Sequence, residues 1–128
     1  MTSNKNLFGV KGKIVFVTGA SSGIGRSAAT CLAEAGAKVI GIARRLDKLK
    51  EWSQETKGET SFFSADVSNK NEVKTIVDEI IKINGDPDIL INAAGLNTRE
   101  HADDVTIKGW NKTLDLNLSA PFFMAQAV

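Results

Sequence analysis

Three glycines stand in one short turn between an apolar run and a helical pattern. The turn is TGASSGIG at residues 18–25, and the apolar run before it covers residues 14–17. Because glycine has no side chain, this turn leaves backbone N–H groups bare at a helix N-terminus, where the helix dipole favours anions. The turn therefore predicts a site for the diphosphate of a nucleotide cofactor. The residues expected there are Thr18, Gly19, Ser21, Ser22, Gly23, Ile24 and Gly25.

The spacing of the glycines limits which type of nucleotide-binding turn this can be. It is G-x-x-x-G-x-G, which differs from the G-x-G-x-x-G of the standard dinucleotide fingerprint, and no Gly-Lys-Ser/Thr follows as in a P-loop. Glycines also make ordinary tight turns, but here a predicted strand precedes them and a predicted helix follows. This context favours a nucleotide site over a simple turn.

Two arginines follow the second apolar run, residues 39–43. NAD sites carry an acidic residue about here, which binds the ribose 2′-OH, whereas this chain has Arg44 and Arg45. A carboxylate would repel a 2′-phosphate, and a guanidinium pairs with one bidentately. The pair predicts NADP in preference to NAD. Arg44 is the first choice because it comes first after the strand; the alternative is that both arginines are solvated loop residues.

Polar or small residues also end two further predicted strands. Asp66 follows residues 61–65 and is expected beside the adenine, where a carboxylate can accept from an amino group; the alternative is a turn or capping carboxylate. Asn92 follows residues 89–91, and the small residues after it let the backbone approach a flat ligand; the alternative is an Asn-initiated turn. The candidate binding residues at these strand ends are Asp66, Val67, Asn92, Ala93, Ala94 and Gly95.

Asn117 interrupts a helical apolar pattern near the C-terminal end. A buried Asn needs hydrogen-bond partners, and the ring of Pro121 would clash with the carbonyl of residue 117 and free or bend that group. The pattern predicts a kinked helix, whose released carbonyl can order a water beside the cofactor. The residues expected on its apolar face are Ile107, Trp110, Leu114 and Leu118.

Apolar runs alternate with helical patterns along the chain. Such alternation predicts an α/β fold, a Rossmann-type doubly wound parallel sheet of strand order 3-2-1-4 with its ligand at the carboxyl ends of the strands. The first helix is expected to bury Ile24, Ala28, Leu32 and Ala35. The clearest helical stripe is Val73, Ile76, Val77, Ile80 and Ile81.

The composition of the chain limits its domain number and the partners it is expected to bind. The 128 residues fit one domain, and 16 basic against 15 acidic side chains give no field that would favour nucleic acid or a membrane surface. Residues 1–9 are expected to be a flexible N-terminus without a signal peptide. Cys31 is expected in the core, His101 in a solvated loop, and no metal site is predicted. These features favour a cytoplasmic protein.

Taken together, the motifs resemble those of the short-chain dehydrogenase/reductase family. Residues 18–25 are similar to its T-G-x-x-x-G-I-G motif, and residues 66–67 to its adenine-contacting pair. Residues 92–95 resemble its N-A-G motif, with Ile91 in place of the first Asn of the common N-N-A-G form. Asn117 falls at the asparagine of the family's Asn-Ser-Tyr-Lys tetrad. The resemblance implies that its backbone carbonyl holds a water in a proton relay to the lysine.

The resemblance also implies an activity, namely NADP(H)-dependent hydride transfer between nicotinamide and a carbonyl or alcohol substrate. Residues 97–117 look similar to sugar-acid dehydrogenases of the gluconate type and to 3-oxoacyl carrier-protein reductases. The sequence contains no tyrosine, the family's general acid. The chain is therefore expected to be the cofactor-binding half of a longer reductase, with later strands missing, and to be inactive alone. The resemblance implies that the parent is a homo-oligomer, a dimer or tetramer, with the last helix in subunit contacts. The alternative is a non-catalytic NADP-binding module or sensor.

Overall fold

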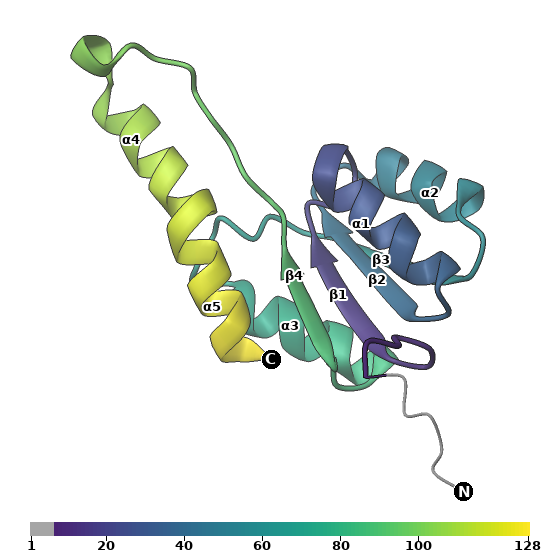
Figure 1. Ribbon diagram of the computed structural model, residues 1–128. Coiled ribbons are helices and arrows are strands. Elements are labelled where there is room, and N and C mark those ends of the chain that lie inside the picture. The colour runs from purple at the N-terminus through teal and green to yellow at the C-terminus, as the bar shows by residue number, and fades with distance from the viewer. Residues whose placement is uncertain (1–6) are drawn as a thin grey trace, which may run out of the picture.

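Four strands form one parallel sheet in the computed structural model, which describes residues 7–128 (Figure 1). The strands are β1 (Ile14–Thr18), β2 (Lys38–Ala43), β3 (Glu59–Ser64) and β4 (Ile89–Asn92). Their order is β3-β2-β1-β4, with every pairing parallel, which confirms the predicted topology. The expectation for residues 1–9 falls largely on residues 1–6, outside the described residues.

The register of the strands brings their carboxyl ends to one edge of the sheet. Thr18 at the end of β1 pairs with Ile42 of β2 on one side and with Asn92 of β4 on the other. The glycine turn, the arginine pair and the segment after β4 therefore all begin at this edge. Such an edge is where open α/β sheets bind their ligands.

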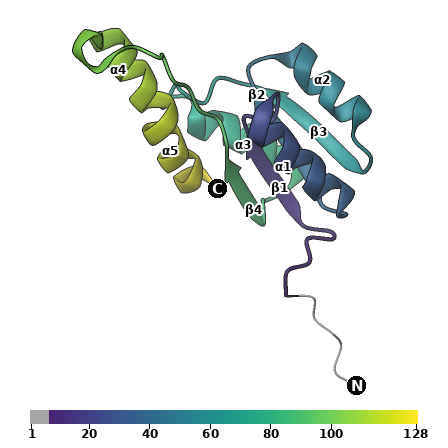
Figure 2. The ribbon, with the colours of Figure 1, turned by 45° about the horizontal axis from the view of Figure 1, so that its top comes forward.

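Helices cover both faces of the sheet. On one face lie α1 (Gly23–Glu34) and α2 (Leu46–Glu55), and on the other lie α3 (Val73–Asn84) and α5 (Ala120–Ala127) (Figure 2). Successive β1 residues serve the two cores in turn, because side chains alternate along a strand: Val15 and Val17 pack toward α1 and α2, and Phe16 packs toward α3 and α5. Burial on both faces accounts for the near-continuous apolar strands.

The buried face of α1 differs from the predicted one. Its buried residues are Gly25, Ala29 and Ala33, whereas Ile24 is 86% exposed. The face is shifted by one residue because the helix lies so close to the sheet that only small side chains fit between them. The same shift puts Cys31 on the exposed side of the helix, so its assignment to the core was wrong.

Two residues on α2 hold it firmly against β2. Leu49 and Trp52 are fully buried, and the indole Nε1 of Trp52 donates to Oγ1 of Thr30 on α1 at 3.1 Å. A Cβ at Gly41 of β2 would lie 2.7 Å from the indole ring, so glycine makes room for it. This packing fixes the start of α2, where the second arginine lies.

The last helical segment is not a regular α-helix throughout. It comprises α4 (Ile107–Leu114), a five-residue π-helical turn η2 (Asp115–Ser119) and α5. Ala120 and Met124 of α5 are buried against the sheet. The predicted apolar face, however, was wrong as a core face: Trp110 and Leu118 are 59% and 64% exposed. The reason is that α4 projects beyond the edge of the sheet (Figure 1).

Candidate cofactor site

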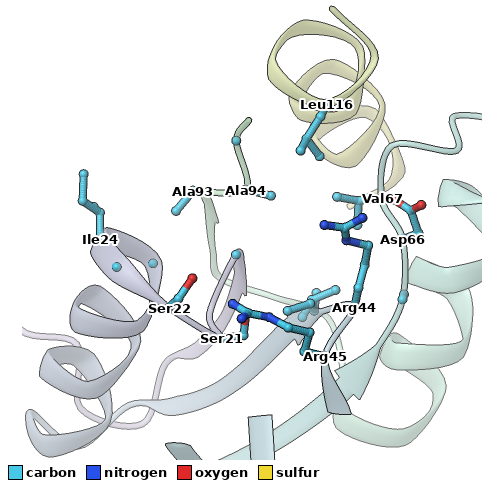
Figure 3. A pocket seen from close by; sticks show the side chains of 17 residues that line it. Ser21, Ser22, Ile24, Arg44, Arg45, Asp66, Val67, Ala93, Ala94 and Leu116 are labelled. Atoms are coloured by element: carbon cyan, nitrogen blue, oxygen red, sulfur yellow. The ribbon is translucent and has the colours of Figure 1, made fainter. Parts of the chain in front are cut away.

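A pocket of about 390 Å³ lies at the carboxyl ends of the strands (Figure 3). Every predicted cofactor-binding residue lines it except Thr18 and Asn92. Four further residues complete the wall: Ile42, Ala43, Ala65 and Leu116. The pocket thus draws on all four strand ends and on the π turn.

Glycines allow three backbone segments to meet at the pocket floor. Gly19 has a φ of +73°, and a Cβ there would lie 2.7 Å from the backbone carbon of Ala93. A Cβ on Gly25 would overlap the carbonyl oxygen of Gly19. The turn, the first turn of α1 and the segment after β4 can therefore approach this closely only without side chains at these positions.

The N-terminus of α1 is open toward the pocket. Its N-cap residue, Ser22, makes no side-chain capping hydrogen bond, and Gly23, Ile24 and Gly25 line the pocket. The first N–H groups of a helix have no partner within the helix, and the helix dipole adds positive potential there. This arrangement suits a bound phosphate group.

Thr18 positions the pocket wall instead of forming it. Its hydroxyl, 2% exposed with the rest of the residue, accepts from the backbone N–H groups of Ala93 and Ala94, both at 3.2 Å. Asn92 is not among the residues that line the pocket. As the last residue of an edge strand it is exposed, and the wall is formed by the backbone and small side chains that follow it.

The two arginines lie at the pocket rim on the β2 side (Figure 3). Arg45 is the N-cap residue of α2, and its Nη2 donates to Oγ of Ser21 at 3.3 Å. The backbone carbonyl of Arg44 accepts from the hydroxyl of Ser64 at 2.9 Å, which anchors this rim to β3. Asp66 is the only acid among the described residues that line the pocket, so its rim is predominantly cationic.

Asp66 forms a local turn and also lines the pocket. Its Oδ1 accepts from the hydroxyl of Ser68 at 2.7 Å and from the backbone N–H of Ser68 at 3.0 Å, a local turn, and it also lines the pocket. The Ser68 hydroxyl, then the Ser68 N–H and the Arg44 charge, outweigh desolvation and hold the pKa of Asp66 below its ordinary value of 3.8. The carboxylate is therefore ionised at neutral pH.

The lowered pKa of Asp66 makes one contribution to stability depend on pH. Because the folded pKa lies below the unfolded one, the contribution is present above pH 3.8 and is lost as the pH falls through the folded pKa. We expect Ser68→Ala to cost about 0.5–1 kcal/mol near neutral pH, with the cost shrinking below about pH 4. Urea unfolding between pH 3 and 7 measures it. Ser53→Ala, which loses a neutral bond to Thr60, should show a cost independent of pH; the same constancy for Ser68→Ala would contradict the expectation.

Asn117 ties the segment after β4 to the π turn. Its Oδ1 accepts from the backbone N–H of Leu96 at 2.8 Å, and its Nδ2 donates to the carbonyl of Leu96 at 2.6 Å. The side chain is thus exposed but fully engaged, not buried on an apolar face as predicted. Pro121 has no N–H, so it cannot donate the usual α-helical hydrogen bond to the carbonyl of residue 117.

Replacing Asn117 tests this tie directly. We expect Asn117→Ala to speed hydrogen exchange of the Leu96 amide by about tenfold or more, because the N–H loses its acceptor. Asn111→Ala, at an exposed position on α4, is the matched control and should leave that amide unchanged. Equal exchange at Leu96 in both variants would mean that another group holds the segment.

A parallel sheet of this order, with a glycine turn entering a helix at its ligand edge, defines a Rossmann-type nucleotide-binding fold. A family model described as short chain dehydrogenase matches residues 13–128. The chain belongs to the short-chain dehydrogenase/reductase family, which confirms the resemblance of its motifs.

Relatives with stated activities cover nearly all of this chain. It is 36% identical over 121 residues to an NAD-dependent glycerol dehydrogenase of Listeria innocua, covering 94% of the chain and 48% of the relative. It is 32% identical over 126 residues to a 2-dehydro-3-deoxy-D-gluconate 5-dehydrogenase of Dickeya dadantii, covering 96% and 49%. The chain therefore spans about half the length of these relatives.

A solved structure has a similar fold. L-sorbose reductase from Gluconobacter frateurii, crystallised with NADPH and L-sorbose, matches with a TM-score of 0.84 at 28% identity, covering 94% of this chain and 47% of that one. One relative is NAD-dependent and this neighbour binds NADPH, so family membership alone does not decide between the two cofactors. Among residues 7–128, no helix is long and apolar enough to cross a membrane.

Proposed function

We propose that this chain binds NADP(H) and forms the cofactor-binding part of an oxidoreductase that acts on a carbonyl or alcohol substrate. One observation carries the choice of cofactor: Arg44 and Arg45 occupy the pocket rim at the end of β2, where an NAD site has an acid. The L-sorbose reductase bound to NADPH supports it. The NAD-dependent glycerol dehydrogenase keeps NAD as the alternative.

The pocket residues fit the parts of this cofactor. The open N-terminus of α1 would hold the diphosphate, and the arginine rim the 2′-phosphate. Asp66 and Val67 would frame the adenine, and the segment from Ala93 to Gly95 would flank the ribose. A bound nicotinamide supplies hydride chemistry at its ring, and this chain's part is to hold and orient it.

Asn117 is the one residue proposed to serve the chemistry itself. The resemblance gives its backbone carbonyl a water in a proton relay, and Pro121 has no N–H to donate to that carbonyl. The 128 residues include no tyrosine, so they do not supply the phenol that the resemblance assigns to proton transfer. We expect the chain to bind cofactor without turnover.

For the substrate we propose a polyol, ketose or sugar acid. The named relatives act on glycerol and 2-dehydro-3-deoxy-D-gluconate, and the structural neighbour holds L-sorbose. The other class suggested by residues 97–117, a 3-oxoacyl thioester, remains the alternative. Both require hydride transfer to or from a carbonyl carbon.

Titration of the purified chain with NADPH and NADH, followed by nicotinamide fluorescence, tests the cofactor assignment. NADPH is expected to bind more tightly; equal affinities would contradict the assignment, and no binding of either would contradict the whole proposal. Reading the coding sequence downstream of the Val128 codon separates two functions. An in-frame Tyr-x-x-x-Lys supports the oxidoreductase, and its absence supports the alternative, a non-catalytic NADP-binding module or sensor.

We further propose that the apolar side chains along α4, η2 and α5 form subunit contacts in a homo-oligomer, a dimer or tetramer. Ile107, Trp110, Leu118 and Phe122 are exposed at helical intervals, and burying such a surface drives association. Sedimentation velocity is expected to show concentration-dependent association that Trp110→Glu with Leu118→Glu abolishes. Ile83→Glu, at an exposed apolar position on α3, is the control. Monomeric wild-type chain at all concentrations would contradict the proposal.

A further inference from the structure

One ion pair joins two segments that meet at one end of the pocket. Nζ of Lys70, in the turn that follows β3, lies 3.8 Å from Oδ1 of Asp115, the first residue of η2. Both segments also line the pocket, the turn through Asp66 and Val67 and η2 through Leu116. Figure 3 shows these three side chains at the same end of the pocket. The ion pair therefore links two parts of the pocket wall without lining the pocket itself.

The turn that carries Lys70 is hydrogen-bonded within itself. The carbonyl of Asp66 accepts from the N–H of Asn69 at 3.4 Å, and its Oδ1 accepts from both donors of Ser68. The carbonyl of Asn69 accepts from the N–H of Glu72 at 3.0 Å, just before α3 begins. Because these bonds tie successive residues of the turn together, a displacement of Lys70 is carried to the part of the turn that lines the pocket.

The ion pair lies beside an apolar junction between the same two segments. Val67 is 6% exposed and belongs to a buried cluster, and Leu116 is partly buried against that cluster. Apolar packing is not directional, so the charges supply a specific attachment that the apolar contact does not. The side chains of Lys70 and Asp115 are 52% and 43% exposed, so salt can screen their attraction. The other ion pairs among residues 7–128 lie on α1, α2 and α3.

From this arrangement we infer that Lys70 and Asp115 are positioning residues, whose ion pair holds this end of the pocket closed and slows release of the cofactor. Two wall segments that are already held together lose less freedom when a ligand binds between them and their neighbours. Release of a bound ligand is faster when such segments separate more easily. The inference rests on the proposed NADP(H) function, and it adds two residues outside the pocket to those that set how long the cofactor stays bound.

The test measures the dissociation rate of NADPH from the purified chain by stopped-flow fluorescence, with excess NADP⁺ as the displacing ligand. Lys70→Met and Asp115→Asn are each expected to speed dissociation about two- to fivefold, the range that a pair of exposed charges contributes. The double variant should be no faster than either single variant, because both substitutions remove the same interaction. At about 1 M salt, where charges are screened beyond about 3 Å, all four proteins should release NADPH at the same rate.

The sign of the Asp115→Asn effect separates this inference from general electrostatics. The cofactor is an anion, so the loss of a carboxylate would by itself slow its release, whereas the loss of the ion pair speeds it. Lys74→Met and Asp78→Asn are the matched controls. They break an exposed pair within α3, with 2.7 Å between Nζ and Oδ1, at positions outside the pocket, and should leave the rate unchanged. Thermal unfolding checks that each variant is folded.

Failure of this inference is distinguishable from failure of the proposed function. If the wild-type chain does not bind NADPH, the proposed function fails and the inference fails with it. If NADPH binds but either substitution at Lys70 or Asp115 leaves its release unchanged or slows it, only the inference fails. The inference also fails alone if the two effects add in the double variant, or if the difference from wild type persists at high salt, because the residues then do not act through their ion pair.

Discussion

The double variant Arg44→Asp with Arg45→Ala is expected to bind NADPH about 100-fold more weakly or worse, while NADH binding is retained or strengthened. Each charge-assisted hydrogen bond to a phosphate contributes about 1.5–3 kcal/mol, and tenfold in affinity corresponds to about 1.4 kcal/mol. The new aspartate adds repulsion toward the 2′-phosphate and supplies the carboxylate that NAD sites use for the ribose 2′-OH.

A matched charge change elsewhere separates recognition from general electrostatics. Lys50→Asp with Lys57→Ala alters the net charge equally at exposed positions outside the pocket. This control is expected to leave the ratio of the NADPH and NADH dissociation constants within about twofold, because neither lysine lines the pocket and salt screens exposed charges. Isothermal titration or fluorescence titration measures the ratio. An unchanged ratio in the arginine variant would remove the 2′-phosphate assignment.

Gly19→Ala is expected to destabilise the fold by about 2–5 kcal/mol and to abolish measurable cofactor binding. An alanine at a φ of +73° is strained by about 1–2 kcal/mol. Its Cβ would also lie 2.7 Å from the backbone of Ala93, and overpacking of this kind typically costs a further 1–3 kcal/mol. Relief of that contact would push the segment after β4 away from the turn and open the pocket floor.

Gly12→Ala separates the cost of backbone strain at positive φ from the cost of the steric contact with Ala93. Gly12 has nearly the same φ, +77°, but a Cβ there meets nothing within 4 Å. We expect a loss of only about 1–2 kcal/mol and unaltered cofactor binding, since Gly12 lies at the opposite end of β1. Urea unfolding curves give the free energies. Equal losses at the two glycines would show that the approach of Ala93 to the turn has no energetic weight.

The sheet was predictable because β1, β2 and β4 are largely branched, apolar runs, as is typical of strands in a parallel sheet. The position of the pocket was also predictable. Once the strand order is known, the carboxyl ends of the parallel strands must meet at one edge of the sheet. The buried face of α1 was not predictable in this way, because its large apolar residues, Ile24 and Leu32, indicated a different face. The helix in fact contacts the sheet through Gly25, Ala29 and Ala33, because close packing favours the smallest side chains.

The two ties that shape the pocket wall were also missed. The hydroxyl of Thr18 accepts from Ala93 and Ala94, and the amide of Asn117 engages Leu96. Both depend on exact distances between segments far apart in the sequence, and no local pattern marks them. The sequence marked Thr18 and Asn117 as candidate site residues, but it did not indicate these hydrogen bonds.

The two tryptophans of the chain report on different parts of it. The indole of Trp52 is fully enclosed between α2 and β2, whereas Trp110 on α4 is mostly exposed. An enclosed indole emits at shorter wavelength and is shielded from iodide, and an exposed one emits further to the red and is quenched. The intrinsic fluorescence of the unlabelled protein therefore carries two separable signals: one follows the integrity of the nucleotide-binding sheet, and the other follows whatever comes to cover the projecting helix.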